Sequence, residues 1–91
     1  MDVAQDFDAF VAIVDAGSIS RGARTLDVPR ATLSRQLARL EKRLGVRLLH
    51  RSTRKLTLTP AGEELYPRAR ALLSTAQAAV RAVQRLSLIH I

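Results

Sequence analysis

The sequence has 91 residues, enough for one small domain with an appended helix, and such a short chain buries only about 60% of the surface that its unfolded form exposes. It contains no cysteine, which excludes disulfides and thiolate metal sites within it, and no apolar run approaches the ~18 residues of a membrane span. The formal net charge of +7 is uneven, because residues 1–20 hold four aspartates and no Lys or Arg, whereas residues 21–91 hold all 15 basic side chains. This Arg-rich asymmetry favours a phosphate-bearing partner. The acidic start does not resemble a secretory signal, so we expect a cytoplasmic location.

Two helices are predicted in the first third of the chain. Residues 3–16 carry an apolar stripe and end at Gly17, a natural C-terminal stop. Ser18 is a suitable N-cap for a short helix that ends near Leu26, and Gly22 within that helix indicates close approach to a neighbour. The turn 27–29 follows, with Asp27 expected in the left-handed region and Pro29 at the entry to the next helix.

A third helix is predicted from Pro29 to Gly45. Four leucines at spacings of four, three and four form a stripe that should face a core: Leu33, Leu37, Leu40 and Leu44. The opposite face carries small and basic residues: Ala31, Arg35, Ala38 and Lys42, flanked by Thr32, Ser34 and Arg39. Such a face fits the major groove of DNA, although a solvated charged surface helix is the plain alternative. Together, residues 18–45 have the pattern of a helix-turn-helix.

After Gly45 the apolar period changes to that of a strand. Val46 and Leu48 alternate with Arg47, and Leu56-Thr57-Leu58 follows a basic stretch, which predicts a two-stranded hairpin. A hairpin at this place is typical of the wing of a winged helix-turn-helix. Its basic residues would lie along the DNA backbone or in the minor groove: Arg51, Arg54 and Lys55. An ordinary polar loop is the alternative.

A long helix is predicted over residues 59–86, with Thr59 as N-cap and Pro60 in its first turn. Its apolar positions form a heptad-like seam that we expect to pair with a second copy: Leu65, Ala69, Leu72, Leu73, Ala76, Ala79, Val80 and Val83. Packing back on its own domain is the alternative. Pro67 predicts a bend near Glu63–Glu64. Residues 87–91 change character and are predicted to be a non-native or disordered tail.

No pattern predicts an enzyme. The two histidines, His50 and His90, are forty residues apart without a third ligand, so we expect no metal, and the glycines form no phosphate-binding loop, so we expect no cofactor.

The sequence from about residue 6 to residue 75 resembles the N-terminal DNA-binding domain of LysR-type transcriptional regulators. The resemblance is carried by Phe10 to Ser20, Ala23, Leu26, Leu33 to Leu37, Leu40-Glu41, Leu44 to Val46, Leu48-Leu49, Arg51 and Leu58 to Gly62. It implies a dimerising linker helix, inverted-repeat sites near promoters, and DNA contacts at Arg30, Ala31, Thr32, Ser34, Arg35, Arg51 and Arg54. Pro29 and Arg30 depart from the usual pattern of Ser or Thr followed by Gln, which leaves the target of Arg30 open. The resemblance also implies a C-terminal effector-binding domain, which these 91 residues do not include.

The sequence therefore predicts a mainly α fold, with a winged helix-turn-helix over 1–58 and a dimerisation helix over 59–86. The expected function is sequence-specific binding of double-stranded DNA as a homodimer. Arg35, Ser34 and Thr32 would read base edges, and the remaining basic contacts would hold the backbone: Arg30, Arg39, Arg51, Arg54 and Lys55. A non-specific nucleic-acid-binding module and a protein-interaction helix bundle are the alternatives.

Overall fold

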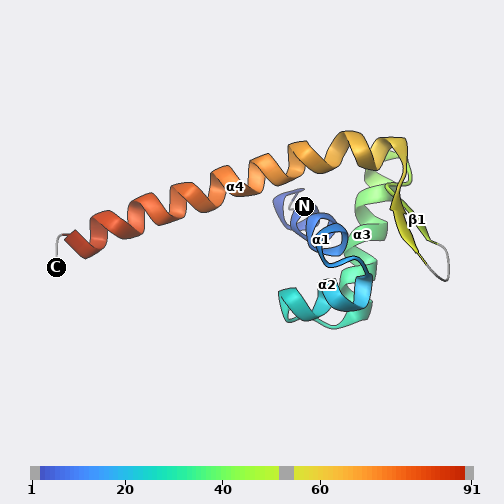
Figure 1. Ribbon diagram of the computed structural model, residues 1–91, viewed down its shortest axis with the longest axis horizontal. Coiled ribbons are helices and arrows are strands. Elements are labelled where there is room, and N and C mark those ends of the chain that lie inside the picture. The colour runs from blue at the N-terminus through green and yellow to red at the C-terminus, as the bar shows by residue number, and fades with distance from the viewer. Residues whose placement is uncertain (1–2, 52–54, 90–91) are drawn as a thin grey trace.

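Four helices and one hairpin make up the computed structural model, which describes residues 3–51 and 55–89. The order is α1 (Val3–Ala16), α2 (Ile19–Leu26), α3 (Arg30–Leu44), β1 (Leu49–Arg51), β2 (Leu56–Leu58) and α4 (Pro60–Ile89). Figure 1 shows α1, α2 and α3 gathered at one end with the hairpin beside α3, while α4 leads away as a long arm. The predicted mainly helical fold, with three helices, a two-stranded wing and a long helix, is confirmed.

The leucine stripe of α3 is buried over three of its four predicted positions. Leu33, Leu37 and Leu40 are at most 1% exposed and pack with residues of α1, among them Phe10 and Ile13. The prediction for Leu44 is wrong, because its residue surface is 45% exposed. Leu44 is the last residue of α3, so the stripe continues past the point where the rest of the domain covers it.

The helix-turn-helix geometry follows the local sequence signals. A Cβ on Gly22 would lie 3.1 Å from Ile13 Cα, so α2 and α1 approach closely, as predicted. Asp27 lies in the left-handed region at φ 56°, and Val28 N–H donates to the Ala23 carbonyl at 3.0 Å. Pro29 is the extended N-cap residue of α3. The turn between the two helices is therefore closed by backbone hydrogen bonds.

The hairpin begins later than the apolar alternation predicts. Leu49 pairs with Leu58 and Arg51 with Leu56 in an antiparallel register, whereas residues 46–48 are not part of a strand. The Leu48 N–H donates to the Glu41 carboxylate at 2.8 Å, while the Leu48 carbonyl accepts from Thr59 N–H at 3.0 Å.

The Thr59 side chain caps α4 and also ties the start of this helix to the chain that enters β1. The Thr59 hydroxyl accepts from Gly62 N–H at 3.0 Å, which confirms the predicted N-cap, and it donates to the Arg47 carbonyl at 2.6 Å. A Cβ on Gly62 would lie 2.1 Å from the Leu48 carbonyl oxygen. Only glycine therefore fits between α4 and the chain that enters β1.

The predicted dimerisation seam of α4 is divided between two environments. Ala69 is fully buried, and Leu65 and Leu73 pack against the same core. These three residues therefore contact their own domain, and they are not part of the exposed face of α4. The remaining seam residues are exposed in the single chain: Leu72, Ala76, Ala79, Val80 and Val83. The prediction for Ala69 as a dimer contact is wrong, because α1 already covers that turn of α4.

The α4 helix is unbroken at Pro67, the residue from which a bend near Glu63–Glu64 is predicted. It passes through Pro67 as one helix, and its ribbon curves gently without a break (Figure 1). It extends to Ile89, so residues 87–89 are helical and not a disordered tail. Residues 90–91 lie outside the described part. Within the described residues, no helix combines the length and the apolar character that crossing a bilayer would need.

A polar network fixes the direction in which α4 leaves the domain. The Tyr66 hydroxyl donates to Asp15, whose other oxygen accepts from Arg70 Nη1 at 2.5 Å. The ring of Tyr66 packs edge-on against Phe10, with centroids 6.4 Å apart. Because Asp15 lies at the end of α1, these contacts join α1 to two successive turns of α4.

The glycine at the start of α4 gives a test in which two effects have opposite signs. Helix propensity alone predicts that Gly62→Ala stabilises the fold by up to ~1 kcal/mol. Because the new methyl would meet backbone, we expect instead a loss of ~1–3 kcal/mol in the free energy of unfolding, measured by urea denaturation. Thr75→Ala, at an exposed position in the same helix, is the control and should not lower stability.

The chain's single tyrosine reports on the contact between α1 and α4. The hydrogen bond to Asp15, then burial and then the aspartate charge raise the pKa of Tyr66 above its ordinary 10.0. Because the pKa of Tyr66 is raised in the folded state, the contribution of this contact to the stability of the fold is fully present below about pH 10. This contribution is lost as the pH rises through the folded-state pKa.

We therefore expect the tyrosinate absorbance of the folded chain to rise with a midpoint above 10. Asp15→Asn should move this midpoint back toward 10, whereas Arg70→Ala should move it upward, because the guanidinium lowers the pKa of Tyr66. Equal midpoints in the parent chain and Asp15→Asn would show that the hydrogen bond is absent in solution.

Candidate nucleic-acid interface

The outer face of α3 is open along its whole length. Ala31, Arg35, Ala38 and Lys42 are all exposed, while Thr32 and Ser34 are half-buried beside them. The burial of the leucine stripe thus turns the small and basic side of the helix outward, as predicted. Small side chains on such a face allow a ligand to approach the backbone closely, and arginine supplies a planar set of donors.

Two arginines near the start of α3 are held by short polar side chains. Arg30 Nε donates to Ser20 Oγ at 3.1 Å, which connects the first residue of α3 to α2. Arg35 Nη2 lies 3.5 Å from Thr32 Oγ1, one turn earlier in the same helix. Both bonds are exposed, so they orient the guanidinium groups while leaving most of their donors available.

Arg39 lies in a different environment from the other basic residues of α3. Its Nη2 donates to Asp6 Oδ1 at 2.6 Å and its Nε to Oδ2 at 3.4 Å. The side chain of Asp6 is fully buried, whereas that of Arg39 is 48% exposed. The hydrogen bond with Asp6 raises the pKa of Arg39. Arg39 therefore joins α3 to α1, and Asp6 already neutralises its charge.

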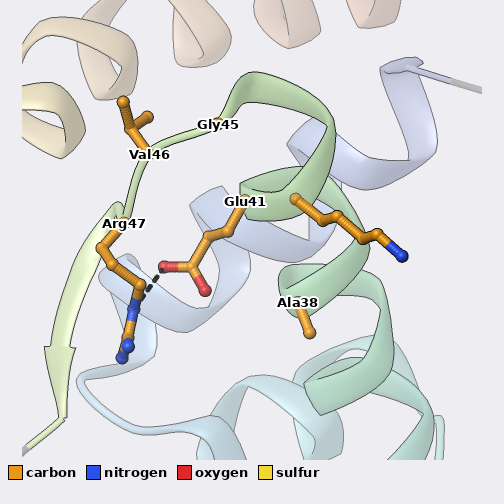
Figure 2. Close-up of a pocket in the computed structure, with 6 residues that line it drawn as sticks. Ala38, Glu41, Gly45, Val46 and Arg47 are labelled. Atoms are coloured by element: carbon orange, nitrogen blue, oxygen red, sulfur yellow. Dashed lines mark ion pairs between the residues drawn. The ribbon is translucent and has the colours of Figure 1, made fainter.

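Glu41 anchors the root of the wing, a role that its sequence position did not reveal. Its carboxylate accepts from the N–H groups of Leu48 and Leu49 at 2.8 and 3.4 Å and lies 3.6 Å from Arg47 Nε. Figure 2 shows Glu41 and Arg47 pointing toward each other from α3 and the loop that follows it. In the sequence, Glu41 is recognisable only as an acidic residue next to the leucine stripe, and acidic residues are also common on solvated helix faces.

The wing brings basic residues to the end of the molecule next to α3. Lys55 is exposed just before β2, and Arg51 is the last residue of β1. Arg54, predicted as a backbone contact, lies outside the described residues. The structure thus places Lys55 and the backbone of Arg51 on the hairpin beside α3, while Arg30 and Arg35 lie on α3 itself (Figure 1).

Charge and an open shape characterise this interface. Among the described residues, no three side chains of the types that bind metals come together. The arrangement can bind an extended, negatively charged ligand through donors on one helix and one hairpin.

Curated proteins similar to this chain are bacterial transcriptional regulators. An HTH-type transcriptional repressor of Pseudomonas aeruginosa strain UCBPP-PA14 is 45% identical over 73 residues, which are 80% of this chain and 23% of that protein. The probable HTH-type transcriptional regulator LtrA of Klebsiella pneumoniae is 41% identical over 80 residues, which are 88% of this chain and 26% of that protein. The chain thus spans about a quarter of the length of these relatives.

Solved structures of similar proteins have the same fold as this chain. The crystal structure of a BenM_DBD/catB site 1 DNA complex matches with a TM-score of 0.86 and 34% identity, over 96% of this chain and 97% of that one. The oxidized form of OxyR from Corynebacterium glutamicum matches with a TM-score of 0.82 and 36% identity, over 88% of this chain and 24% of that one.

The family model that matches the chain covers the three helices, the hairpin and the first turn of α4. It is described as the bacterial regulatory helix-turn-helix protein, lysR family, and it spans residues 4–63. Because this match extends over more than half of the sequence and agrees with the fold, the chain belongs to the LysR family of bacterial regulatory helix-turn-helix proteins.

Proposed function

We propose that this chain is the sequence-specific, double-stranded DNA-binding domain of a LysR-type transcription regulator, and that it binds inverted-repeat promoter sites as a dimer. The observation that carries the proposal is the exposed small and basic face of α3 beside a basic hairpin. The likeness to a domain solved in complex with DNA supports it. The proposed role is binding rather than catalysis, in the cytoplasm, where the chromosome of a bacterium lies.

The proposed contacts divide into base reading and backbone positioning. Arg35, Ser34 and Thr32 read base edges in the major groove, and Ala31 lets the helix backbone approach the bases. Arg30, Arg51, Arg54 and Lys55 hold phosphates on either side. Arg39 contributes least among the predicted backbone contacts, since its guanidinium is already paired with Asp6.

The proposed dimer forms through the part of α4 that its own domain leaves uncovered. Its contacts are Leu72, Ala76, Ala79, Val80 and Val83, all of them exposed in the single chain. A two-fold axis between two such helices would match the inverted symmetry of the proposed sites.

Replacing the central arginine of α3 tests base reading. On a duplex selected from a random pool with the parent chain, Arg35→Ala should weaken binding by ~1–3 kcal/mol and relax the preference at one position of each half-site. The measurement is a titration against the selected duplex and its single-base variants. Lys42→Ala, at the far end of the same exposed face, should leave the base preference unchanged. An unaltered preference in Arg35→Ala would contradict the assignment of α3 as the reading helix.

Replacing the wing lysine tests backbone positioning. Lys55→Ala should weaken binding to selected and random duplexes alike, and it should reduce the slope of log K against log salt by about one. The parent chain should prefer the selected duplex over random DNA by ~10³ or more at physiological salt. A ratio near one would instead identify a non-specific nucleic-acid-binding module.

A further inference from the structure

A single residue of α3 binds the backbone of the segment that leads into the wing. The Glu41 carbonyl accepts from Gly45 N–H at 2.8 Å and from Val46 N–H at 3.2 Å. Its carboxylate accepts from Leu48 N–H at 2.8 Å and from Leu49 N–H at 3.4 Å. Figure 2 shows the side chain extending from α3 toward this segment. Glu41 therefore binds four of the five N–H groups of residues 45–49, two through its carbonyl and two through its carboxylate.

These hydrogen bonds supply a direction that apolar packing does not. Leu48 and Leu49 are each 1% exposed, so their burial already attaches the root of the hairpin to the domain. Burial of apolar surface is non-directional, whereas a hydrogen bond weakens steeply when its angle changes. The Glu41 side chain is 8% exposed, and a carboxylate is costly to bury unless it is hydrogen-bonded. Its contacts therefore fix the angle at which the hairpin leaves α3.

The hairpin has further attachments that lead to α4. Thr59 N–H donates to the Leu48 carbonyl at 3.0 Å, and the Thr59 hydroxyl donates to the Arg47 carbonyl at 2.6 Å. The ladder of the hairpin itself pairs Leu49 with Leu58. A hairpin without the Glu41 carboxylate would thus stay formed and joined to α4, while its angle to α3 would no longer be fixed.

A small change of that angle has a large effect at the wing. Lys55 immediately precedes Leu56, which pairs with Arg51 at the end of β1. About 10 Å of strand, three residues, therefore separates Leu49 from the level of Lys55. A tilt of about 15° at Leu49 would move that level by roughly 3 Å, which is enough to break a hydrogen bond. A freely tilting wing would also lose affinity, because binding would have to order it.

We propose that Glu41 is a positioning residue for DNA recognition, which sets the hairpin at a fixed angle to α3 so that Arg35 and Lys55 meet one duplex together. This inference rests on the proposed function and deepens it. Glu41 acts through the backbone of Leu48 and Leu49 and not through a contact with DNA. The proposal gives one buried acid the task of joining the reading helix and the wing into a single surface.

A double-mutant cycle tests the proposal. Lys55→Ala should weaken binding of the parent chain to its selected duplex about fivefold at physiological salt, as expected for one phosphate contact. In the Glu41→Met background, the same replacement should change the dissociation constant by less than about twofold, because the wing no longer holds a phosphate. Arg35→Ala should weaken binding by the same factor in both backgrounds, since the buried leucines still orient α3.

Two control variants separate positioning from a general loss of stability. Glu41→Gln keeps an oxygen that can accept from Leu48 N–H, so Lys55→Ala should again weaken binding about fivefold in that background. Ile13→Val removes a buried methyl group of α1, and it should lower stability without reducing the effect of Lys55→Ala. Circular dichroism checks that each variant is folded. An undiminished effect of Lys55→Ala in folded Glu41→Met would overturn the proposal.

Spin labels test the fixed angle without a Glu41 variant and without DNA. Because the chain contains no cysteine, Arg43→Cys/Thr57→Cys places one label on α3 and one on β2, both at exposed positions. The distribution of distances between the labels in the free chain should be as narrow as that of Arg24→Cys/Arg43→Cys, which spans α2 and α3. A clearly broader distribution for the wing pair would contradict the proposal, even if Glu41→Met fails to fold.

Failure of this inference is distinguishable from failure of the proposed function. A parent chain without preference for any duplex would overturn the proposed function and this inference with it. A parent chain that prefers its selected duplex, but in which the effect of Lys55→Ala survives the loss of Glu41, would overturn the positioning role and leave the proposed function intact.

Discussion

Burial of the leucine stripe of α3 against α1 is the interaction on which the rest of the structure depends. Leu33, Leu37 and Leu40 are almost fully removed from water, and each such side chain contributes about 1.5–3 kcal/mol relative to an exposed one. Since α3 has only one apolar side, this burial fixes the rotation of the helix. The opposite side, with Arg35 at its centre, must then face outward.

Three of the eight acidic residues join separate elements of the domain. Asp6 joins α1 to α3 through Arg39, Asp15 joins α1 to α4 through Tyr66 and Arg70, and Glu41 holds the backbone at Leu48. These acids lie buried or at helix contacts, where each forms hydrogen bonds. Because these three acids are used inside the domain, they add no free negative charge to the outer face of α3, which suits a polyanionic ligand.

The α4 helix has two roles along one apolar strip. Its first turns complete the core of their own domain, where Ala69 is fully buried, and its distal half extends beyond that domain with Val80 and Val83 exposed. The network at Asp15 sets the direction of the whole helix, since it joins two of its turns to α1. The geometry of any dimer built on α4 is thus coupled to the position of α3.

The sequence by itself determined the elements, the caps at Ser18 and Thr59, the turn at Asp27 and the outward face of α3, because these features depend on neighbours a few residues away. Only the tertiary structure decided which residues cover each apolar stripe and which partner each charge finds. Periodicity shows that a face is apolar, but it does not show that Ala69 is fully buried while Leu44 stays 45% exposed. The ion pair of Asp6 with Arg39 joins residues 33 positions apart, so local pattern carried no sign of it.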